Sequence, residues 1–156
     1  MSDTSRVLGL YRKVTSLPCG VAIISWLITF KAPYFRSIKP RITRLEKGHC
    51  EVRIKKRWRV TNHIGTVHAI AMCNMAELSG GLMTDATIPG SMRWIPKGMT
   101  VEYLKKAETD LVATATPLAE PEEGKSMDYP VRVSVTDTAG QEVFRANITM
   151  YLSPKR

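Results

Sequence analysis

Residues 62–77 of the chain read NHIGTVHAIAMCNMAE, and this stretch decides the fold more than any other part of the 156-residue sequence. It places a polar turn directly before a run that is apolar on every side of a helix, except for three polar groups. Because a surface helix carries a single apolar stripe, apolarity all round predicts a buried helix. A buried carboxylate is rare unless it is paired or has a chemical task. Glu77 is therefore the first candidate for a functional residue.

The segments on either side of this helix predict strands. The helix itself is expected over about 67–83, with Gly80-Gly81 weakening its last turn. Before it, residues 51–60 alternate between apolar and charged side chains, which predicts a strand with one buried and one basic face. After it come four strand-like runs, joined by turn-forming segments that make neighbouring strands antiparallel. These runs cover residues 91–106 with a break at Pro96, 110–118, 129–137 and 141–152.

The N-terminal part is expected to be helical. Residues 4–16 predict a short helix with Thr4 as a possible N-cap, and residues 19–30 predict a second helix followed by a linker with Pro33 and Pro40. The apolar run Leu17 to Phe30 mimics a signal peptide, but it is shorter than the ~20 residues of a membrane span. We expect it to pack on the domain, with the apolar group of Ile23, Ile24, Leu27 and Ile28 closing one end of a pocket. A membrane anchor is the alternative interpretation.

Together these elements predict an α+β fold in which one curved antiparallel sheet wraps around a central helix. The length fits a single domain over residues 1–156, with helices and a linker in 1–40 and the core in 41–152. A helix that is apolar on all sides needs more cover than a curved sheet provides. A second copy of the chain supplies it most simply, so we expect a homodimer or homotetramer.

The net charge of +9 is concentrated in one part of the chain. Between residues 31 and 59, only Glu46 and Glu51 oppose a basic cluster. Such a cluster attracts phosphates of nucleic acid, of an anionic membrane or of a nucleotide-bearing molecule, or it forms only a solvated face. The cluster consists of Lys31, Arg36, Lys39, Arg41, Arg44, Lys47, Arg53, Lys55, Lys56, Arg57 and Arg59.

The cysteine and histidine content argues against a metal site and for a reduced compartment. The three cysteines, Cys19, Cys50 and Cys73, are odd in number and lack disulfide or metal-ligand spacing, so a cytoplasmic location is expected. The three histidines also lack ligand spacing. A basic nucleic-acid-binding domain would need a recognition motif that the chain lacks, so no nucleic-acid partner is expected.

His68 and Glu77 are nine residues apart, which places them about 180° apart around a helix and about 13 Å apart along it. They cannot meet within one chain. A two-fold dimer with antiparallel helices would bring His68 of one chain close to Glu77 of the other and create two identical sites. The same spacing is equally compatible with two unrelated polar groups.

The pattern of Asn62, Gly65, His68 and Glu77 resembles the hotdog-fold thioesterases of the phenylacetyl-CoA thioesterase type. The strand-like segment 101–107 (VEYLKKA) looks like the hotdog strand that follows the central helix. The N-terminal helices with Pro33-Tyr34 are similar to an uncharacterised hotdog family that carries such helices. The resemblance covers residues 40–152 well and the N-terminal helices more loosely.

The resemblance implies an acyl-CoA thioesterase, and no cofactor is expected. The histidine spacing and the short apolar run give the further expectations of no metal and no stable membrane insertion. Glu77 takes the position of the base or nucleophile, the backbone around His68 and Ala69 that of the oxyanion donors, and Asn62 that of a group orienting the carbonyl or the water. Substrate contacts are expected from Gly65, Ala69, Gly80, Gly81, Arg57 and Arg59. The chain departs from the family where Ala69-Ile70 replaces a Gly-Gly pair, which narrows the approach to the backbone. A non-catalytic module that binds acyl-CoA is therefore the alternative function.

Overall fold

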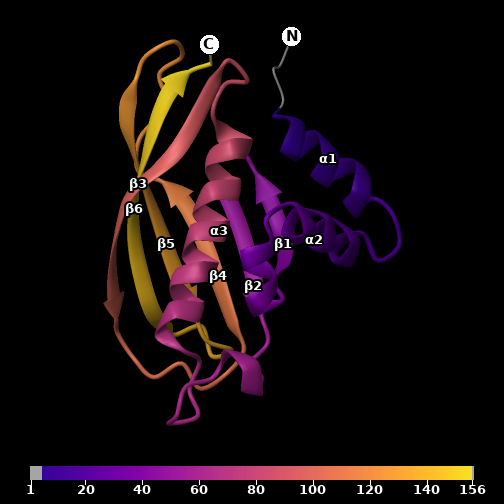
Figure 1. Ribbon diagram of the computed structural model, residues 1–156, viewed down its shortest axis with the longest axis vertical. Helices are drawn as coiled ribbons and strands as arrows, with labels where there is room; N and C mark the ends of the chain where they lie inside the picture. The colour runs from indigo at the N-terminus through magenta and orange to yellow at the C-terminus, as the bar shows by residue number, and fades with distance from the viewer. Residues whose placement is uncertain (1–4, 156) are drawn as a thin grey trace.

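The computed structural model describes residues 5–155 and confirms the expected α+β hotdog fold (Figure 1). Six antiparallel strands form one curved sheet in the order β1-β2-β4-β5-β6-β3. The long helix α3 lies against its concave face, and two shorter helices pack beside it. The helices are α1 (Arg6–Thr15), α2 (Gly20–Lys31) and α3 (Ala69–Thr87), with 3-10 turns η1 (Pro33–Ile38) and η2 (Trp58–Val60). The strands are β1 (Arg41–Glu46), β2 (His49–Ile54), β3 (Met92–Tyr103), β4 (Leu111–Pro117), β5 (Met127–Thr136) and β6 (Glu142–Pro154).

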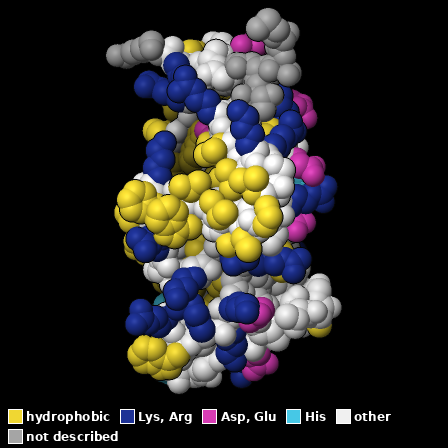
Figure 2. All heavy atoms as spheres, turned by 90° about the vertical axis from the view of Figure 1, so that its right-hand side faces the viewer, with side chains coloured by type: hydrophobic (Ala, Val, Ile, Leu, Met, Phe, Trp, Pro, Cys, Tyr) yellow, Lys and Arg dark blue, Asp and Glu magenta, His cyan; other side chains and the backbone are white. Residues whose placement is uncertain are grey.

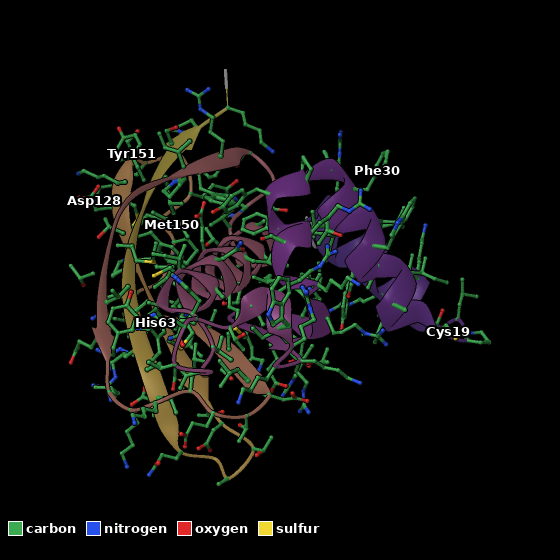
Figure 3. The ribbon with its side chains drawn as sticks, turned by 60° about the horizontal axis from the view of Figure 1, so that its bottom comes forward. Cys19, Phe30, His63, Asp128, Met150 and Tyr151 are labelled. Atoms are coloured by element: carbon green, nitrogen blue, oxygen red, sulfur yellow. The ribbon has the colours of Figure 1, made fainter. Side chains whose placement is uncertain are left out.

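Side-chain alternation along the strands builds the core. Val131, Val133 and Val135 of β5 are fully buried beneath α3, as the alternating pattern predicted. Figure 3 shows the same alternation in β6, where Met150 points toward α3 while Tyr151 lies on the opposite face of the sheet. Two stacked layers, sheet and helix, therefore share one core.

Helix α3 is longer than the sequence predicted because Gly80-Gly81 does not end it. A Cβ added at Gly80 would lie 2.9 Å from Ile148 Cδ1, and one at Gly81 would lie 2.7 Å from the ring of Trp94. The two glycines therefore let the helix approach the sheet closely, and burial compensates for their low helix propensity. The helix continues to Thr87.

The prediction of one strand over residues 51–60 was wrong, because two strands precede α3. Strand β1 forms a hairpin with β2 through Gly48, whose φ is +74°. An irregularity between Ile42 and Arg44 breaks the alternation of β1, which hid this strand in the sequence. Strand β2 ends at Ile54, and Trp58 in η2 is 87% exposed instead of buried.

Strand β3 forms one edge of the sheet and runs without a break through Pro96. Proline lacks an N–H group, and an edge strand tolerates it when that position faces away from the neighbouring strand. The pairing with β6 shifts between Pro96 and Gly98. The other edge is β1, which is only half as long.

Helices α1 and α2 pack against each other and against β1, at the side of the sheet opposite β3 (Figure 1). Ser5 caps α1 by accepting a hydrogen bond from the Leu8 N–H at 3.3 Å, whereas the expected cap Thr4 lies outside the described residues. Helix α2 packs through Ile24, as expected, but Ile23 and Leu27 are exposed and do not close a pocket. Among residues 5–155, no helix has both the length and the apolarity that crossing a membrane requires.

Candidate active site

The start of helix α3 is organised by His68. This residue is the N-cap, and its Nδ1 accepts a hydrogen bond from the Ile70 N–H at 3.0 Å. The His68 N–H donates to the Val60 carbonyl at 2.8 Å. The N–H of Ala69 donates to no group among the described residues. Of the two amides expected to hold an oxyanion, only that of Ala69 is therefore available, and the positive end of the helix dipole adds to its field.

The loop before α3 is held together by Asn62. Its Oδ1 accepts from the N–H groups of Ile64 and Thr66, both at 3.1 Å, and its Nδ2 donates to Thr66 Oγ1 at 2.8 Å. Gly65 has φ +77°, a backbone conformation that side chains other than glycine rarely adopt. Figure 3 shows His63 in this loop, next to the start of α3. Within the single chain, Asn62 and Gly65 thus shape the loop that presents the helix N-terminus.

Glu77 is exposed in the single chain, and this corrects the expectation that α3 is buried on every side. Ile70, Cys73 and Glu77 lie on one stripe of the helix, spaced three and four residues apart. Ile70 is 54% exposed and Cys73 is half-buried. The sheet, together with α1 and η1, covers most of the rest of the helix but leaves this stripe open. A narrow surface of two apolar side chains and one carboxylate therefore faces outward on the N-terminal half of α3, whereas Leu78 to Thr84 are buried.

Strand β3 borders the same opening. Met99 and Tyr103 pair with Ile148 and Phe144 of β6, whose side chains face the core, so they lie on the concave side of the sheet. Both are partly exposed there. The Tyr103 hydroxyl lies 3.4 Å from Cys73 Sγ, one helical turn from Glu77. This hydrogen bond, together with burial, raises the pKa of Tyr103 to about 12. The sequence marked Tyr103 only as part of a strand, because nothing local predicts a contact across 30 residues.

His68 and Glu77 lie at different levels of helix α3: His68 is its N-cap, and Glu77 is in its third turn. Within one chain the helix axis separates them, as their spacing predicted. Asn74, one turn before Glu77, does not contact the carboxylate. Its Nδ2 donates to Ser37 Oγ at 3.2 Å, and its buried Oδ1 has no hydrogen-bond partner among the described residues.

Gly80 and Gly81 lie away from the opening. The space beside them is filled by Ile148 and by Trp94, whose Nε1 lies 3.4 Å from Asp85 Oδ1. In the single chain these glycines have a packing role, and their expected contact with a pantetheine arm stays a prediction.

Arg57 and Arg59 face two different hollows. Arg59 lines one of about 800 Å³ together with Trp58, Asn62 and Gly65, beside the loop that precedes α3. Arg57 lines a larger one of about 1280 Å³ on the side of α2, and its Nη2 donates to the Ser37 carbonyl at 2.7 Å. The two arginines, which the sequence placed in one basic cluster, therefore serve different surfaces. Only Arg59 lies near the start of α3.

The remaining nucleophiles and metal-binding side chains form no second centre. His49 Nε2 lies 3.1 Å from Glu51 Oε1, and burial raises the pKa of the Cys50 thiol, so these neighbours form no reactive dyad. Over residues 5–155, no three His, Cys, Asp or Glu side chains come together in a way that would hold a metal ion.

Comparison with known proteins identifies the family. The model of a family described as a domain of unknown function, DUF4442, matches residues 20–152. The chain belongs to this family. A crystal structure of the structural-genomics protein APC5556 is 45% identical, covers 97% of this chain and 98% of its own, and superposes with a TM-score of 0.82. No curated protein matches the sequence significantly.

Two further solved structures are similar to this chain at lower identity. Protein PA5026 of Pseudomonas aeruginosa, described as a "probable thioesterase", is 25% identical, covers 89% of this chain and 97% of its own, and has a TM-score of 0.75. Protein smu.793 of Streptococcus mutans, solved with acetyl CoA, is 23% identical over 75% of this chain and 90% of its own, with a TM-score of 0.65. At this identity the second likeness shows the shared fold.

Proposed function

We propose that this DUF4442 protein hydrolyses acyl-CoA thioesters at a site formed between two copies of the chain. One observation carries the proposal: Glu77 lies, with Ile70 and Cys73, on a stripe of α3 that the described residues leave open. This stripe is bordered by the edge strand β3, whose outer side pairs with no described strand. A second chain that pairs through β3 would enclose the carboxylate in an apolar cleft. The "probable thioesterase" and the acetyl CoA complex among the solved structures support the substrate class.

The open edge explains how the dimer forms. Strand β3 is 12 residues long, and its outer N–H and C=O groups can pair with a second β3 in antiparallel orientation. Two-fold pairing continues the sheet across both chains and lays the two α3 helices side by side. The helices then run in opposite directions, so the N-terminus of each lies near Glu77 of the other. Met99 and Tyr103 become part of the shared interior.

The proposed chemistry divides between the two chains. The Glu77 carboxylate of one chain removes a proton from a water molecule, whose oxygen forms a bond to the thioester carbonyl carbon. The Ala69 N–H of the other chain donates to the oxyanion that develops, assisted by the helix dipole. When the tetrahedral intermediate collapses, the C–S bond breaks and the proton on Glu77 passes to the leaving thiolate. The products are a carboxylic acid and the free CoA thiol. Direct attack by Glu77 on the carbonyl carbon is the other route open to this carboxylate.

The hollow beside the start of α3 is suited to the nucleotide end of CoA. Trp58 is 87% exposed there and offers a face on which an adenine ring can stack, while Arg59 offers charge to the phosphates. Both follow β2 directly and precede the loop of Asn62. The β3 edge accounts for the dimer interface, and a homotetramer would need a second interface.

A second candidate function is binding of acyl-CoA without hydrolysis. It is favoured by Ile70, whose side chain is 54% exposed in the first turn of α3, where a glycine pair would leave the backbone free. An assay of thiol release from short, medium, long and aromatic acyl-CoAs tests hydrolysis. Turnover of at least one member supports the proposal. Micromolar binding of acyl-CoA by calorimetry without any turnover would establish the binding module instead.

A further inference from the structure

The outer face of α2 carries an exposed apolar stripe. Ile23, Trp26, Leu27 and Phe30 follow a spacing of three, four and seven residues, so they lie on one side of the helix. Their exposed fractions range from 36% to 63%, while Ile24 on the opposite side is fully buried. The rings of Trp26 and Phe30 stack with centroids 5.3 Å apart. Figure 3 shows Phe30 on the outer side of the helix pair, directed away from the sheet.

Other large apolar side chains extend this stripe into a patch. Leu10 of α1, Leu17 in the connection and Tyr34 in η1 are between 46% and 70% exposed. Figure 2, which looks onto the face formed by α1 and α2, shows a broad apolar area in its centre with Lys and Arg side chains above and below it. A contiguous exposed apolar patch of this kind, rimmed by polar groups, marks an interaction surface.

The basic rim is continuous with a hollow beside the stripe. Trp26 lines this hollow of about 1280 Å³, and six basic side chains surround it: Arg36, Lys39, Arg41, Arg53, Lys55 and Arg57. None of the six forms an ion pair with another described residue. Two acids also line the hollow. Asp110 accepts from the Lys56 N–H, and Asp137 accepts from two backbone N–H groups in its turn.

We propose that α2 docks this protein onto the surface of a membrane rich in anionic phospholipid. The apolar stripe would enter the boundary between headgroups and acyl chains, and the basic hollow would receive lipid phosphates. Helices of this type present Trp, Phe and Leu to the bilayer and Lys or Arg to the headgroups, and their binding combines apolar burial with charge attraction. Each basic residue near an anionic leaflet adds to the attraction.

The length of α2 restricts it to the plane of the surface. Its 12 residues extend about 18 Å, whereas the hydrocarbon core of a bilayer is about 30 Å thick. The buried face of the helix also stays on β1, because Ser25 Oγ accepts a hydrogen bond from the Ile42 N–H of that strand. The protein therefore binds peripherally and without a membrane span.

The positive charge around the α2 patch favours an anionic bilayer over a second copy of the chain as its binding partner. Two copies that met through α2 would bring two sets of unpaired basic side chains together, with Asp110 and Asp137 already engaged by backbone amides. Like charges at such a contact repel each other. An anionic surface instead neutralises them.

The test is sedimentation of the full-length protein with vesicles of phosphatidylcholine alone, or with about 30% phosphatidylglycerol added. Wild type is expected to sediment with the anionic vesicles and to be released by high salt. The double variant Trp26→Ser/Phe30→Ser is expected to lose at least ~10-fold in partitioning, because two large apolar side chains no longer become buried. The pair Lys39→Glu/Arg41→Glu is expected to lose binding to the anionic vesicles. A matched control, Ile95→Ser, removes an exposed apolar side chain from the far face of the sheet and keeps binding.

A fluorescence measurement separates docking from a folding defect. Wild type is expected to show a blue shift in emission on binding. Trp26→Phe keeps an apolar ring, so it should still sediment with anionic vesicles but lose most of that blue shift. Wild type that stays in the supernatant with both vesicles would overturn the proposal. So would a Trp26→Ser/Phe30→Ser variant that binds like wild type, or one that instead dissociates into smaller oligomers, which would assign the patch to a second copy.

Discussion

The two edge strands of the sheet differ in whether the chain covers them. At the short edge, the Ile42 N–H of β1 donates to Ser25 Oγ at 2.9 Å, and helix α2 packs along the strand. At the long edge, β3 has β6 as its neighbour on one side, and no other described strand pairs with its outer side. The covered edge cannot accept another strand, whereas the long edge can.

This difference shows which edge of the sheet one chain protects by itself and which edge it leaves available for pairing. Exposed edge strands invite pairing with other chains, and proteins usually cover, shorten or charge them. Strand β3 is long, and it carries the partly exposed Met99 and Tyr103 on the side that faces Glu77. The β1 edge is protected by the chain itself. The β3 edge, in our proposal, is protected by a second copy that completes the active site at the same time.

The largest expected effect comes from placing a charge at the open edge. Met99→Glu should raise the dissociation constant of the dimer by ~100-fold or more, because an unpaired carboxylate at an interface costs about 3–5 kcal/mol. Thiol release should fall with the dimer population. Arg44→Glu introduces the same residue on β1 and should leave the dimer intact. Analytical ultracentrifugation measures both, and equal effects at the two edges would contradict the comparison.

The next largest effect is expected at Glu77, the exposed carboxylate beside the open β3 edge. Glu77→Gln keeps the shape of the side chain but removes the base, so kcat should fall by ~100-fold or more. The dimer and the melting temperature should be retained, because a neutral amide is cheaper to enclose than a carboxylate. Glu108→Gln makes the same change in an exposed loop and should leave kcat unchanged. Full activity in a folded Glu77→Gln dimer would remove Glu77 from the mechanism.

A smaller effect is expected at the covered edge. Ser25→Ala removes the acceptor of the buried Ile42 N–H, which should lower the free energy of unfolding by about 1–3 kcal/mol. Ser16→Ala, at an exposed helix end, should change it by less than ~0.5 kcal/mol. Denaturant titration followed by circular dichroism measures both. If Ser25→Ala were as stable as wild type, the hydroxyl would not be what protects this edge.

The smallest effect distinguishes the two arginines. Arg59→Ala should raise KM for acyl-CoA about 5-fold and weaken its salt dependence, since an exposed charge contact is worth up to about 1 kcal/mol. Arg57→Ala should leave KM nearly unchanged, because its side chain faces the hollow beside α2. Steady-state kinetics at two ionic strengths measures the difference. A larger effect for Arg57 would place the CoA phosphates on the α2 side.

The sequence predicted the elements whose pattern is regular. The strands β5 and β6 follow from period-two alternation, the central helix from its all-round apolarity, and the first N-terminal helix from its end signals. Strand β1 was missed because its irregularity separates Ile42 and Leu45 by three residues, which breaks the alternation. Trp58 was assigned to a buried face because the sequence does not mark the end of β2.

At the candidate site, the sequence could not predict features that depend on contacts between distant elements. The apolar character of α3 predicted burial but could not say what provides it, so the exposure of Glu77 in one chain was not foreseen. Glu77 was singled out because it is a carboxylate in an apolar helix, and the resemblance gave Glu77 and the helix start their roles, which stay predictions. The hydrogen bonds of Asn62 depend on the folded loop, and the contact between Cys73 and Tyr103 depends on the sheet. No local pattern encodes either of them.

Mixing two inactive variants tests the shared site most directly. Ala69→Pro removes the free amide at the first position of α3, where proline is well tolerated, and the extended backbone of His68 suits a residue before proline. It should cost ~100- to 1000-fold in kcat, whereas Ala69→Gly keeps the N–H and should retain activity. In a refolded equal mixture of Ala69→Pro and Glu77→Gln, half of the dimers are mixed and each contains one intact site. Thiol release should then recover to about a quarter of the wild-type rate. A mixture that stays as inactive as its components would contradict a site built from two chains.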